Sequence, residues 1–182
     1  MNRDRALEEL KARLTDDKRL QHSIAVEAIM RKLAKHLHAE IEIWGLTGLL
    51  HDIDLDIVEG DLNRHGLVAA EILEGLSVDP TVIYSIKTHN PRLGYQRRRK
   101  LDKALYCCDH LPRLIEKCAL SVPGKSISGL DSDYLVQKFN EDGFFNEPDK
   151  EQIATCSELG LTLKEFFDIG LDAMKEIEYK LG

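Results

Sequence analysis

Apolar residues recur at intervals of three and four along most of the chain, and this periodicity constrains the fold more than any other feature. Leu7, Leu10 and Leu14 follow this spacing in the first segment, and the apolar side chains of residues 19–37 repeat with a period near 3.6 residues. Such a period places them on one face of an α-helix. No stretch alternates apolar and polar residues as a half-buried strand would. The sequence therefore predicts an all-α domain.

Further helices are expected between clear break signals. An Asp before a Pro starts a helix, whereas a Pro inside one removes a hydrogen-bond donor. Helices are expected at 40–50, at about 64–74, at 101–117 with a kink at Pro112, and at 134–139. Another helix begins at Asp79-Pro80 and ends before Asn90-Pro91. The last helix begins with a capping box of Thr162 and Glu165. A long loop is expected at 121–131 and turns at 140–148. The chain is read as one domain over 1–182, with a core of about 16–118 and a C-terminal helical extension of about 119–182.

Composition excludes several classes of protein. Hydrophobic residues make up 43% of the 182 and charged residues 31%, which excludes a disordered chain and a membrane protein. The N-terminus carries no apolar signal region, so a soluble cytoplasmic protein is expected. A net charge of −7 lacks the positive field that gathers nucleic acid, so no polynucleotide or membrane partner is expected. The four cysteines show no CxxC pair and are expected to be reduced core residues.

Polar residues on the apolar faces carry the functional signal. His22 shares a helical face with Val26 and Ile29, so its imidazole is expected to point toward the core. The same inward placement is expected for five further residues: His51, Asp52, His65, His89 and Asp109. Thr47 and Gly48, in the turn before His51, are small enough to let a neighbouring helix approach.

Inward imidazoles and carboxylates in this number point to a metal. A single inward histidine is more often a core residue with an ordinary partner, but burying six such groups separately would cost several kcal/mol. One shared cation satisfies them together, and neutral imidazole with carboxylate is the ligand set of Fe, Mn, Co, Ni or Zn. The sequence predicts a centre of one or two divalent transition-metal ions, with the metal left open.

The order of these residues resembles a known family. His22, then His51-Asp52, then Asp109 resembles the H…HD…D signature of the HD-domain superfamily of metal-dependent phosphohydrolases. His65-Gly66 and the run around His89 resemble the two extra histidines of subfamilies that hold two metals. The resemblance covers residues 19 to about 114 and implies the HD helical bundle; the rest is similar to the tail of small bacterial proteins described only as HD hydrolases.

The resemblance also implies roles for single residues. The residues that would hold the first metal are His22, His51, Asp52 and Asp109. His65 and His89 would join a second ion, with Asp52 bridging the two. Arg19, one turn before His22, matches the arginine that relatives use against phosphate, and its planar fork suits that task. A solvated arginine at a helix start is the alternative.

One departure from the family pattern concerns the residues after the His-Asp pair. Many relatives read His-Asp-Ile-Gly-Lys, and some use that lysine at the reaction centre. Here the run is His51-Asp-Ile-Asp54-Leu, so the glycine and the lysine are absent and a mechanism that relies on the lysine does not carry over. Asp54 is expected to orient a ligand or to act as a base, with an ordinary surface carboxylate as the alternative. The catalytic candidates are therefore Asp52, Arg19 and Asp54.

A basic run follows His89 in this otherwise acidic chain. Its six cations are Arg92, Arg97, Arg98, Arg99, Lys100 and Lys103. The run is either a solvated loop or the rim of a pocket for a polyphosphate or nucleotide, with Tyr95 stacking on a base. The substrate-binding candidates are Arg19, Lys87, Arg92 and Arg97. His36, His38 and His110 are expected to have no role.

Three functions follow as hypotheses. The first is a metal-dependent phosphohydrolase acting on a small phosphorylated metabolite, in particular a nucleotide. The second is a di-iron oxygenase, since some HD relatives with the same six ligands activate dioxygen. The third is a regulatory module that binds a nucleotide without turnover, which an intact ligand set argues against.

Overall fold

The computed structural model describes the backbone of residues 1–181 and the side chains of residues 1–177. Over these residues the chain forms helices and no strand, which confirms the all-α prediction. The α-helices are α1 (Arg3–Lys11), α2 (Asp17–His36), α3 (Ile41–Leu50), α4 (Leu55–Val58), α5 (Leu67–Gly75), α6 (Pro80–His89), α7 (Lys100–Cys108), α8 (Leu111–Leu120), α9 (Ser132–Asn140), α10 (Glu147–Ala154) and α11 (Leu163–Leu181). Three short 3₁₀ helices are η1 (Pro91–Leu93), η2 (Ile127–Gly129) and η3 (Thr155–Leu159). None of the described helices is long and apolar enough to cross a membrane.

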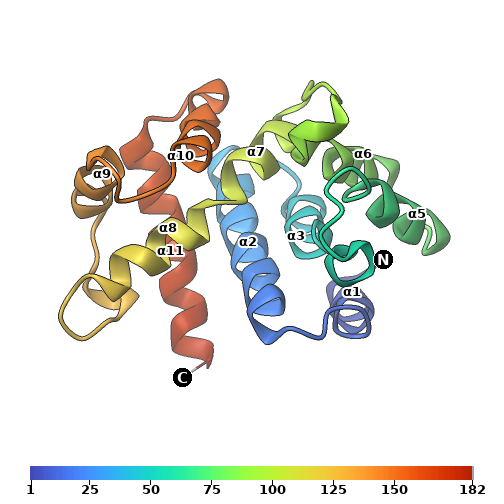
Figure 1. Ribbon diagram of the computed structural model, residues 1–182, viewed down its shortest axis with the longest axis horizontal. Helices are drawn as coiled ribbons and strands as arrows, with labels where there is room; N and C mark the ends of the chain where they lie inside the picture. The colour runs from blue at the N-terminus through green and yellow to red at the C-terminus, as the bar shows by residue number, and fades with distance from the viewer. Residues whose placement is uncertain (182) are drawn as a thin grey trace.

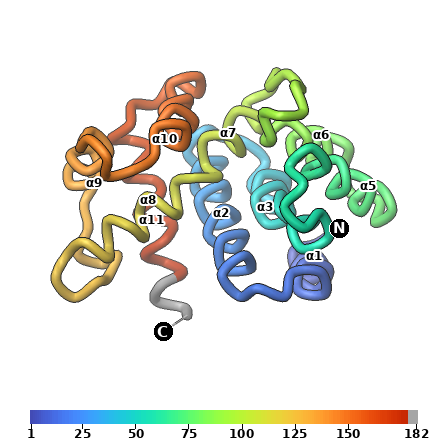
Figure 2. Tube along the Cα trace, in the orientation of Figure 1, coloured from blue at the N-terminus to red at the C-terminus, as the bar shows by residue number. Residues whose placement is uncertain are grey.

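Helix α2 lies at the centre of the molecule. It packs against α3 on one side and against α11 on the other. In Figure 1, α1, α3, α5 and α6 form the half to the right of α2, and α8 to α11 form the half to the left. Helix α7 passes over one end of α2 and connects the two halves, as the trace in Figure 2 also shows. Residues of both halves therefore meet around the C-terminal end of α7 and one face of α2.

Side-chain caps start several of these helices, and those of α6 and α11 were predicted from the sequence. The side chain of Asp16 accepts a hydrogen bond from the Lys18 amide at the start of α2. Asp79 accepts from the Thr81 amide before Pro80. At the start of α11 the predicted capping box is present, because Glu165 accepts from the Thr162 amide at 2.8 Å and Thr162 Oγ1 accepts from the Glu165 amide at 3.2 Å.

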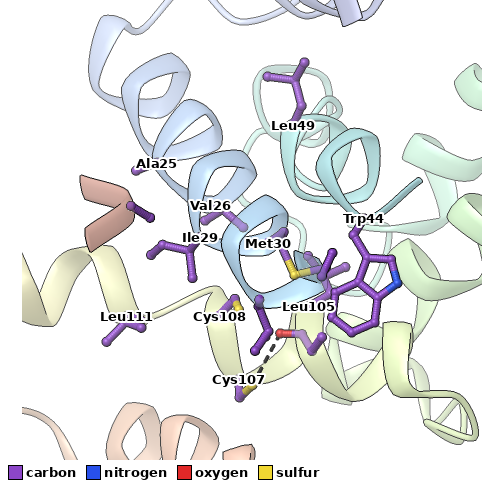
Figure 3. Close-up of a cluster of buried hydrophobic side chains, with 14 of the residues drawn as sticks. Ala25, Val26, Ile29, Met30, Trp44, Leu49, Leu105, Cys107, Cys108 and Leu111 are labelled. Atoms are coloured by element: carbon purple, nitrogen blue, oxygen red, sulfur yellow. Dashed lines mark hydrogen bonds between the residues drawn. The ribbon is translucent and has the colours of Figure 1, made fainter. Parts of the chain in front are cut away.

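The core is built around the inward face of α2. Ile29, Met30 and Leu33 are fully buried there, and Figure 3 shows the first two facing Leu105 of α7. All four cysteines are free and buried, as predicted; Cys107 and Cys108 lie in this cluster. The core therefore joins α2 to the helix that carries the last residue of the family signature.

The predicted close approach of two helices is present between α2 and α3. A Cβ atom on Gly48 would lie 2.9 Å from the carbonyl oxygen of Val26 and 3.0 Å from the Cα of Glu27. Real Cβ atoms essentially never come that close to backbone, so only glycine lets α3 lie this near to α2. The contact fixes the end of α3, where His51 follows.

The expected helix over 101–117 is two helices. Helix α7 ends at Cys108, and α8 begins at Leu111 with Pro112 in its first turn. A proline in a first turn loses no hydrogen bond, so the chain breaks before Pro112 rather than bending at it. The break leaves Asp109 and His110 at the junction between the helices.

Two further segments differ from the expectation. Helix α10 begins within the segment expected to be turns, where Asn146 caps it and Pro148 occupies its first turn. His65 lies in the turn before α5 rather than inside the helix. That turn is held by a buried acceptor, Asp54, described below.

Candidate metal centre

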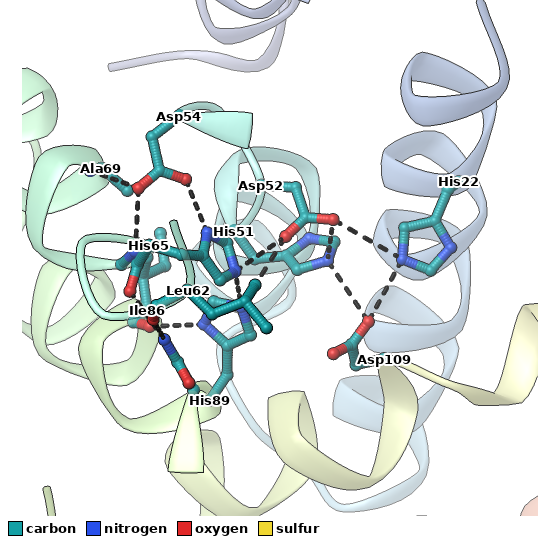
Figure 4. A network of polar contacts seen from close by, with 12 residues as sticks. His22, His51, Asp52, Asp54, Leu62, His65, Ala69, Ile86, His89 and Asp109 are labelled. Carbon is teal, nitrogen blue, oxygen red and sulfur yellow. Dashed lines mark hydrogen bonds and ion pairs between the residues drawn. The ribbon is translucent and has the colours of Figure 1, made fainter. Parts of the chain in front are cut away.

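Six residues converge between α2, α3, α6 and the junction of α7 with α8, and all six were predicted to point inward. His22 comes from α2, His51 and Asp52 directly follow α3, and His89 is the last residue of α6. His65 precedes α5, and Asp109 follows α7. In Figure 4, His22 and Asp109 lie on one side of Asp52, and His65 with His89 on the other.

Two groups of these residues are compact enough to surround a cation. The first is His22, His51 and Asp52, and the second is Asp52, His65 and His89. Within each group, one ligand atom per residue lies within 4.8 Å of the others. Asp109 adjoins the first group, with its Oδ1 3.2 Å from Nε2 of His22 and 3.6 Å from Nε2 of His51.

Asp52 belongs to both groups, and its two oxygens face different ones. Its Oδ2 lies 3.2 Å from Nε2 of His51 and 3.9 Å from Nε2 of His22. Its Oδ1 lies 3.4 Å from Nε2 of His65 and 3.7 Å from Nε2 of His89. A carboxylate divided in this way has the geometry of a bridge between two ions.

Hydrogen bonds orient three of the imidazoles. Nδ1 of His51 donates to the Gly48 carbonyl at 2.8 Å, Nδ1 of His65 donates to Asp54 at 2.8 Å, and Nδ1 of His89 donates to the Ile86 carbonyl. A carbonyl or carboxylate oxygen can only accept a hydrogen bond, so Nδ1 carries the hydrogen in each case and Nε2 faces the centre. Metal-ligating histidines are oriented in this manner.

The donor atoms facing the centre fit a cation. Nε2 of His51 is fully buried and has no hydrogen-bond partner in the described structure. Nε2 of His65 lies 2.9 Å from Nε2 of His89, and with both hydrogens placed on Nδ1 the two lone pairs face each other. Burying such unpaired acceptors is costly unless a cation or proton lies between them. The residues present therefore fit divalent metal ions at both groups.

Charges in the centre shift its pKa values in a direction that favours ion pairs. Burial by itself would lower the pKa of His51, but the carboxylates of Asp52 and Asp109 outweigh it and raise that pKa well above its usual value. Burial would raise the pKa of Asp52, yet its contacts with His51 and His89 hold it well below the usual range. The carboxylates of Asp52 and Asp109 therefore stay ionised, and His51 binds a proton more firmly than a free imidazole does.

Asp54 lies behind His65 and away from the pocket. Its side chain is completely buried, so the alternative of a surface carboxylate is wrong. One oxygen accepts from Nδ1 of His65, and the other accepts from the amides of Gly66 at 2.8 Å and Ala69 at 2.9 Å. This placement matches the orienting role predicted for Asp54; its oxygens do not face the pocket, which argues against the role of a base.

Asn90 fixes the same turn from the other side. Its amide nitrogen donates to the carbonyls of Leu62 at 2.6 Å and His65 at 2.9 Å. The turn that carries His65 is thereby tied to the end of α6, beside His89. The sequence pattern indicated Asn90 only as a helix stop.

A pocket of about 1100 Å³ opens directly onto the centre. Five of the six converging residues line it: His22, Asp52, His65, His89 and Asp109. Its cations are Lys18, Arg19, Arg92 and Arg113. The lining also holds the carboxylates of Asp52, Asp109, Glu116 and Asp149, so the cations offer local contacts for an anionic group rather than an excess of positive charge.

The substrate-binding candidates divide between this pocket and other places. Arg19 and Arg92 line it, and the guanidinium of Arg19 pairs with Asp56. Lys87 borders a separate hollow of about 410 Å³, 3.7 Å from Glu74, because it lies two residues before His89 and so on the opposite face of α6. The structure therefore does not bring Lys87 to the pocket.

Most of the basic run lies outside the pocket, where arginines of the run contact aromatic and acidic side chains. Arg97 lies 3.6 Å above the ring of Tyr106, and Arg99 pairs with buried Asp102 at 2.8 Å. The predicted stacking residue, Tyr95, packs edge-on against Tyr84 with ring centroids 6.3 Å apart. Of the run, only Arg92 reaches the pocket.

Sequence reasoning missed several pocket residues. They are His110, Arg113, Glu116, Asp149 and Gln152. Helical spacing from Asp109 would have indicated Arg113, had the break before Pro112 been recognised. No sequence signal marks Asp149, because its position depends on how α10 packs.

The fold and the site define an all-α protein with a buried cluster of histidines and aspartates that is suited to divalent metal ions. Comparison with protein families gives the particular family: the model of the HD domain matches residues 19–114, more than half of the chain. The chain belongs to the HD-domain family, which suggests metal-dependent hydrolase activity in general and whose domains bind divalent metals. No curated protein and no solved structure matches it.

Proposed function

We propose that this protein is a metal-dependent phosphohydrolase that cleaves a phosphate ester or anhydride of a small metabolite. The observation that carries the proposal is that one pocket holds both the two donor groups sharing Asp52 and four cationic side chains. Metal ions and guanidinium groups together are what phosphoryl oxygens require.

The ligand roles follow from the geometry. His22, His51, Asp52 and Asp109 would hold one ion, and Asp52, His65 and His89 would hold the other. When bound, divalent ions supply Lewis acidity and lower the pKa of water. The protein itself orients the ligands. Asp54 and the carbonyls of Gly48 and Ile86 accept hydrogen bonds from the imidazoles of His65, His51 and His89 and keep them oriented.

Arg19 is proposed to bind the scissile phosphoryl group. It lies one turn before His22 on α2 and lines the pocket. Asp56 accepts hydrogen bonds from the amide and hydroxyl of Thr15, both at 2.7 Å, and so holds the Arg19 guanidinium from a fixed position. A preorganised cation of this kind stabilises charge that develops during phosphoryl transfer.

The cations favour this function over the two alternatives. Dioxygen is uncharged and needs no guanidinium groups, so a di-iron oxygenase accounts for Arg19 and Arg92 only where its organic substrate is itself anionic. A module that only binds nucleotides does not account for donors oriented at two metal positions. Nucleotides stay among the candidate substrates, although no Phe, Tyr or Trp is found among the described residues that line the pocket.

The test is elemental analysis of freshly purified protein, followed by a phosphate-release screen over nucleotides and sugar phosphates with the metal found. We expect metal-dependent release from at least one compound, and none from the Asp52→Asn variant. Oxygen uptake without phosphate release in the iron-loaded protein would instead establish the oxygenase.

A further inference from the structure

The C-terminal extension forms one wall of the pocket, beyond the region that matches the HD-domain model. Pro148, Asp149 and Gln152 of α10 line the pocket, whereas the match ends at residue 114. Helix α10 lies against α7, and the side-chain amide of Gln152 donates to the Tyr106 carbonyl at 2.9 Å. Asp149 lies one turn earlier on α10 and therefore faces the junction of α7 and α8.

Asp149 orients a guanidinium in the pocket. Its Oδ2 accepts from Nη2 of Arg113 at 3.1 Å, and its Oδ1 lies 3.7 Å from Nε2 of His110. The same Nη2 of Arg113 contacts Nδ1 of His110. Since a guanidinium donates and cannot accept, Nδ1 of His110 is the acceptor, and the three side chains form one connected cluster.

Arg113 has hydrogen-bonding capacity to spare. Both contacts use Nη2, and the Nε and Nη1 hydrogens have no partner among the described residues. The Arg113 side chain is 51% exposed and lines the pocket, while that of Asp149 is only 16% exposed. One terminal nitrogen of the guanidinium, Nη2, is thus anchored in the protein, and Nη1 and Nε keep hydrogens to donate.

Arg113 follows Asp109 by four residues, across the junction of α7 and α8, and both side chains line the pocket. Arg19 lies on α2, one turn before His22, whereas Arg113 pairs with Asp149 of α10, so the two arginines line the pocket from different elements. A second oxyanion on the substrate would accept a charge-assisted hydrogen bond from the free Nη1 of Arg113.

Resting on the proposed function, we propose that Arg113, oriented by Asp149, is a specificity-determining residue that binds a second oxyanion group of the substrate. The substrate is then a phosphorylated compound with a further phosphoryl or carboxylate group, rather than a simple monophosphate. Asp149 is a positioning residue that acts through Arg113.

The test is calorimetric titration of the Mn²⁺-loaded protein with linear alkanediol bisphosphates, from ethanediol to hexanediol, and with the matching monophosphates. A parallel series of phosphoalkanoic acids separates a phosphoryl from a carboxylate partner. We expect the best dianionic probe to bind about 10-fold more tightly than its monophosphate, and Arg113→Gln to abolish the difference, as for loss of hydrogen bonds to a charged group. Arg98→Gln removes an equal charge from an exposed position outside the pocket and should leave the difference intact.

Asp149→Asn separates orientation from overall charge. It removes a negative charge, so a purely electrostatic pocket would bind the bisphosphate more tightly, whereas loss of orientation weakens binding of the second oxyanion. Weaker binding of the bisphosphate with unchanged binding of the monophosphate supports the proposal.

Three results would overturn the proposal: equal or no binding of both probes by the wild type, a bisphosphate preference that survives Arg113→Gln, or tighter bisphosphate binding by Asp149→Asn. Because binding is measured without turnover, failure of the phosphate-release screen would count against the proposed hydrolase activity and not against this subsite.

Discussion

At the scale of single residues, the centre depends on which ring nitrogen of each histidine carries the hydrogen. For His51 and His89 a carbonyl of the same chain segment, three residues earlier, accepts from Nδ1. For His65 the acceptor is Asp54, eleven residues before it. The first two orientations follow from local helix geometry, whereas the third depends on a single side chain.

Replacing Asp54 with Asn should therefore weaken metal binding at the second group. The amide would present its NH₂ either to Nδ1 of His65 or to the amides of Gly66 and Ala69, so a donor would face a donor. Loss of such an outer partner typically costs 10- to 100-fold in metal affinity. Metal titration should show a weakened second ion, with the first ion retained; Asp142→Asn, on the exposed surface, serves as the matched control. Unchanged affinity for both ions would show that Asp54 does not position His65.

Metal affinity should fall as the pH is lowered through the neutral range. The pKa of His51 is raised well above its usual value in the metal-free protein. Burial would lower the pKa of His65, but the hydrogen bond to Asp54 and the charges of Asp52 and Asp54 together outweigh burial and raise it. Imidazoles with a raised pKa keep their protons to a higher pH than a free histidine does, and these protons must leave before Nε2 can bind a metal. Calorimetry in buffers of different ionisation enthalpy should detect proton release on metal binding. An affinity independent of pH between 6 and 8 (about the range in which histidines titrate) would contradict this.

At the scale of elements, the position of α3 against α2 determines where His51 and Asp52 lie. Gly48→Ala places a methyl group at 2.9 Å from the Val26 carbonyl, and backbone on both sides cannot yield locally. We expect destabilisation of about 1–3 kcal/mol, as for overpacking elsewhere, together with weaker metal binding, since His51 follows in the next turn. Urea unfolding and metal titration would measure both effects. Gly75→Ala is the matched control, because a Cβ there meets nothing within 4 Å; equal effects of the two variants would refute the packing explanation.

Buried Glu27 of helix α2 forms two ion pairs, one of which joins helix α1 to helix α2. It accepts from Nε of Arg3 at 2.7 Å and from Nε of Arg31 at 2.8 Å, so it ties α1 to α2. Glu27→Gln should destabilise the protein by about 1–3 kcal/mol, the range for losing hydrogen bonds to a charged group, because the two arginine partners stay partly exposed to solvent. The readout is the free energy of unfolding of the metal-free protein, with exposed Glu8→Gln as the control. A change no larger than that of the control would show that the cluster contributes little.

Element positions also show what the sequence could and could not predict. Capping residues such as Asp79 and Thr162 identified helix starts correctly because their hydrogen bonds are local. Pro112 was misplaced inside a helix because a proline is compatible with both a kink and a first turn, and only the packing of α8 decides between them. Helix α10 was missed because a short helix begins there amid residues typical of turns.

At the scale of the whole molecule, the six converging residues could be named from the sequence because inward polar residues on apolar faces must share a partner. The pocket around them could not be predicted, because its walls come from segments distant in the chain. Asp149 is 36 residues from Arg113, and nothing in the local pattern of either residue indicates the contact. Lys87 and Arg97 were assigned to the pocket on proximity in sequence to His89, which helix faces and ring contacts override.

Metal binding should stabilise the whole fold, since its ligands join α2, α3 and α6 to the junction of α7 and α8. His22 and Asp109 alone are 87 residues apart in the chain. A ligand at 100 times its dissociation constant stabilises the native state by about 2.7 kcal/mol, which for a domain of this size raises the Tm by about 5–10 °C. Differential scanning calorimetry with Mn²⁺ and after chelation would measure the shift. His51→Ala should remove the response to metal, because the first ion loses a ligand, whereas His65→Ala should reduce the bound metal toward one ion per chain and retain part of the shift. If both variants respond to metal as the wild type does, the two donor groups are not the metal sites.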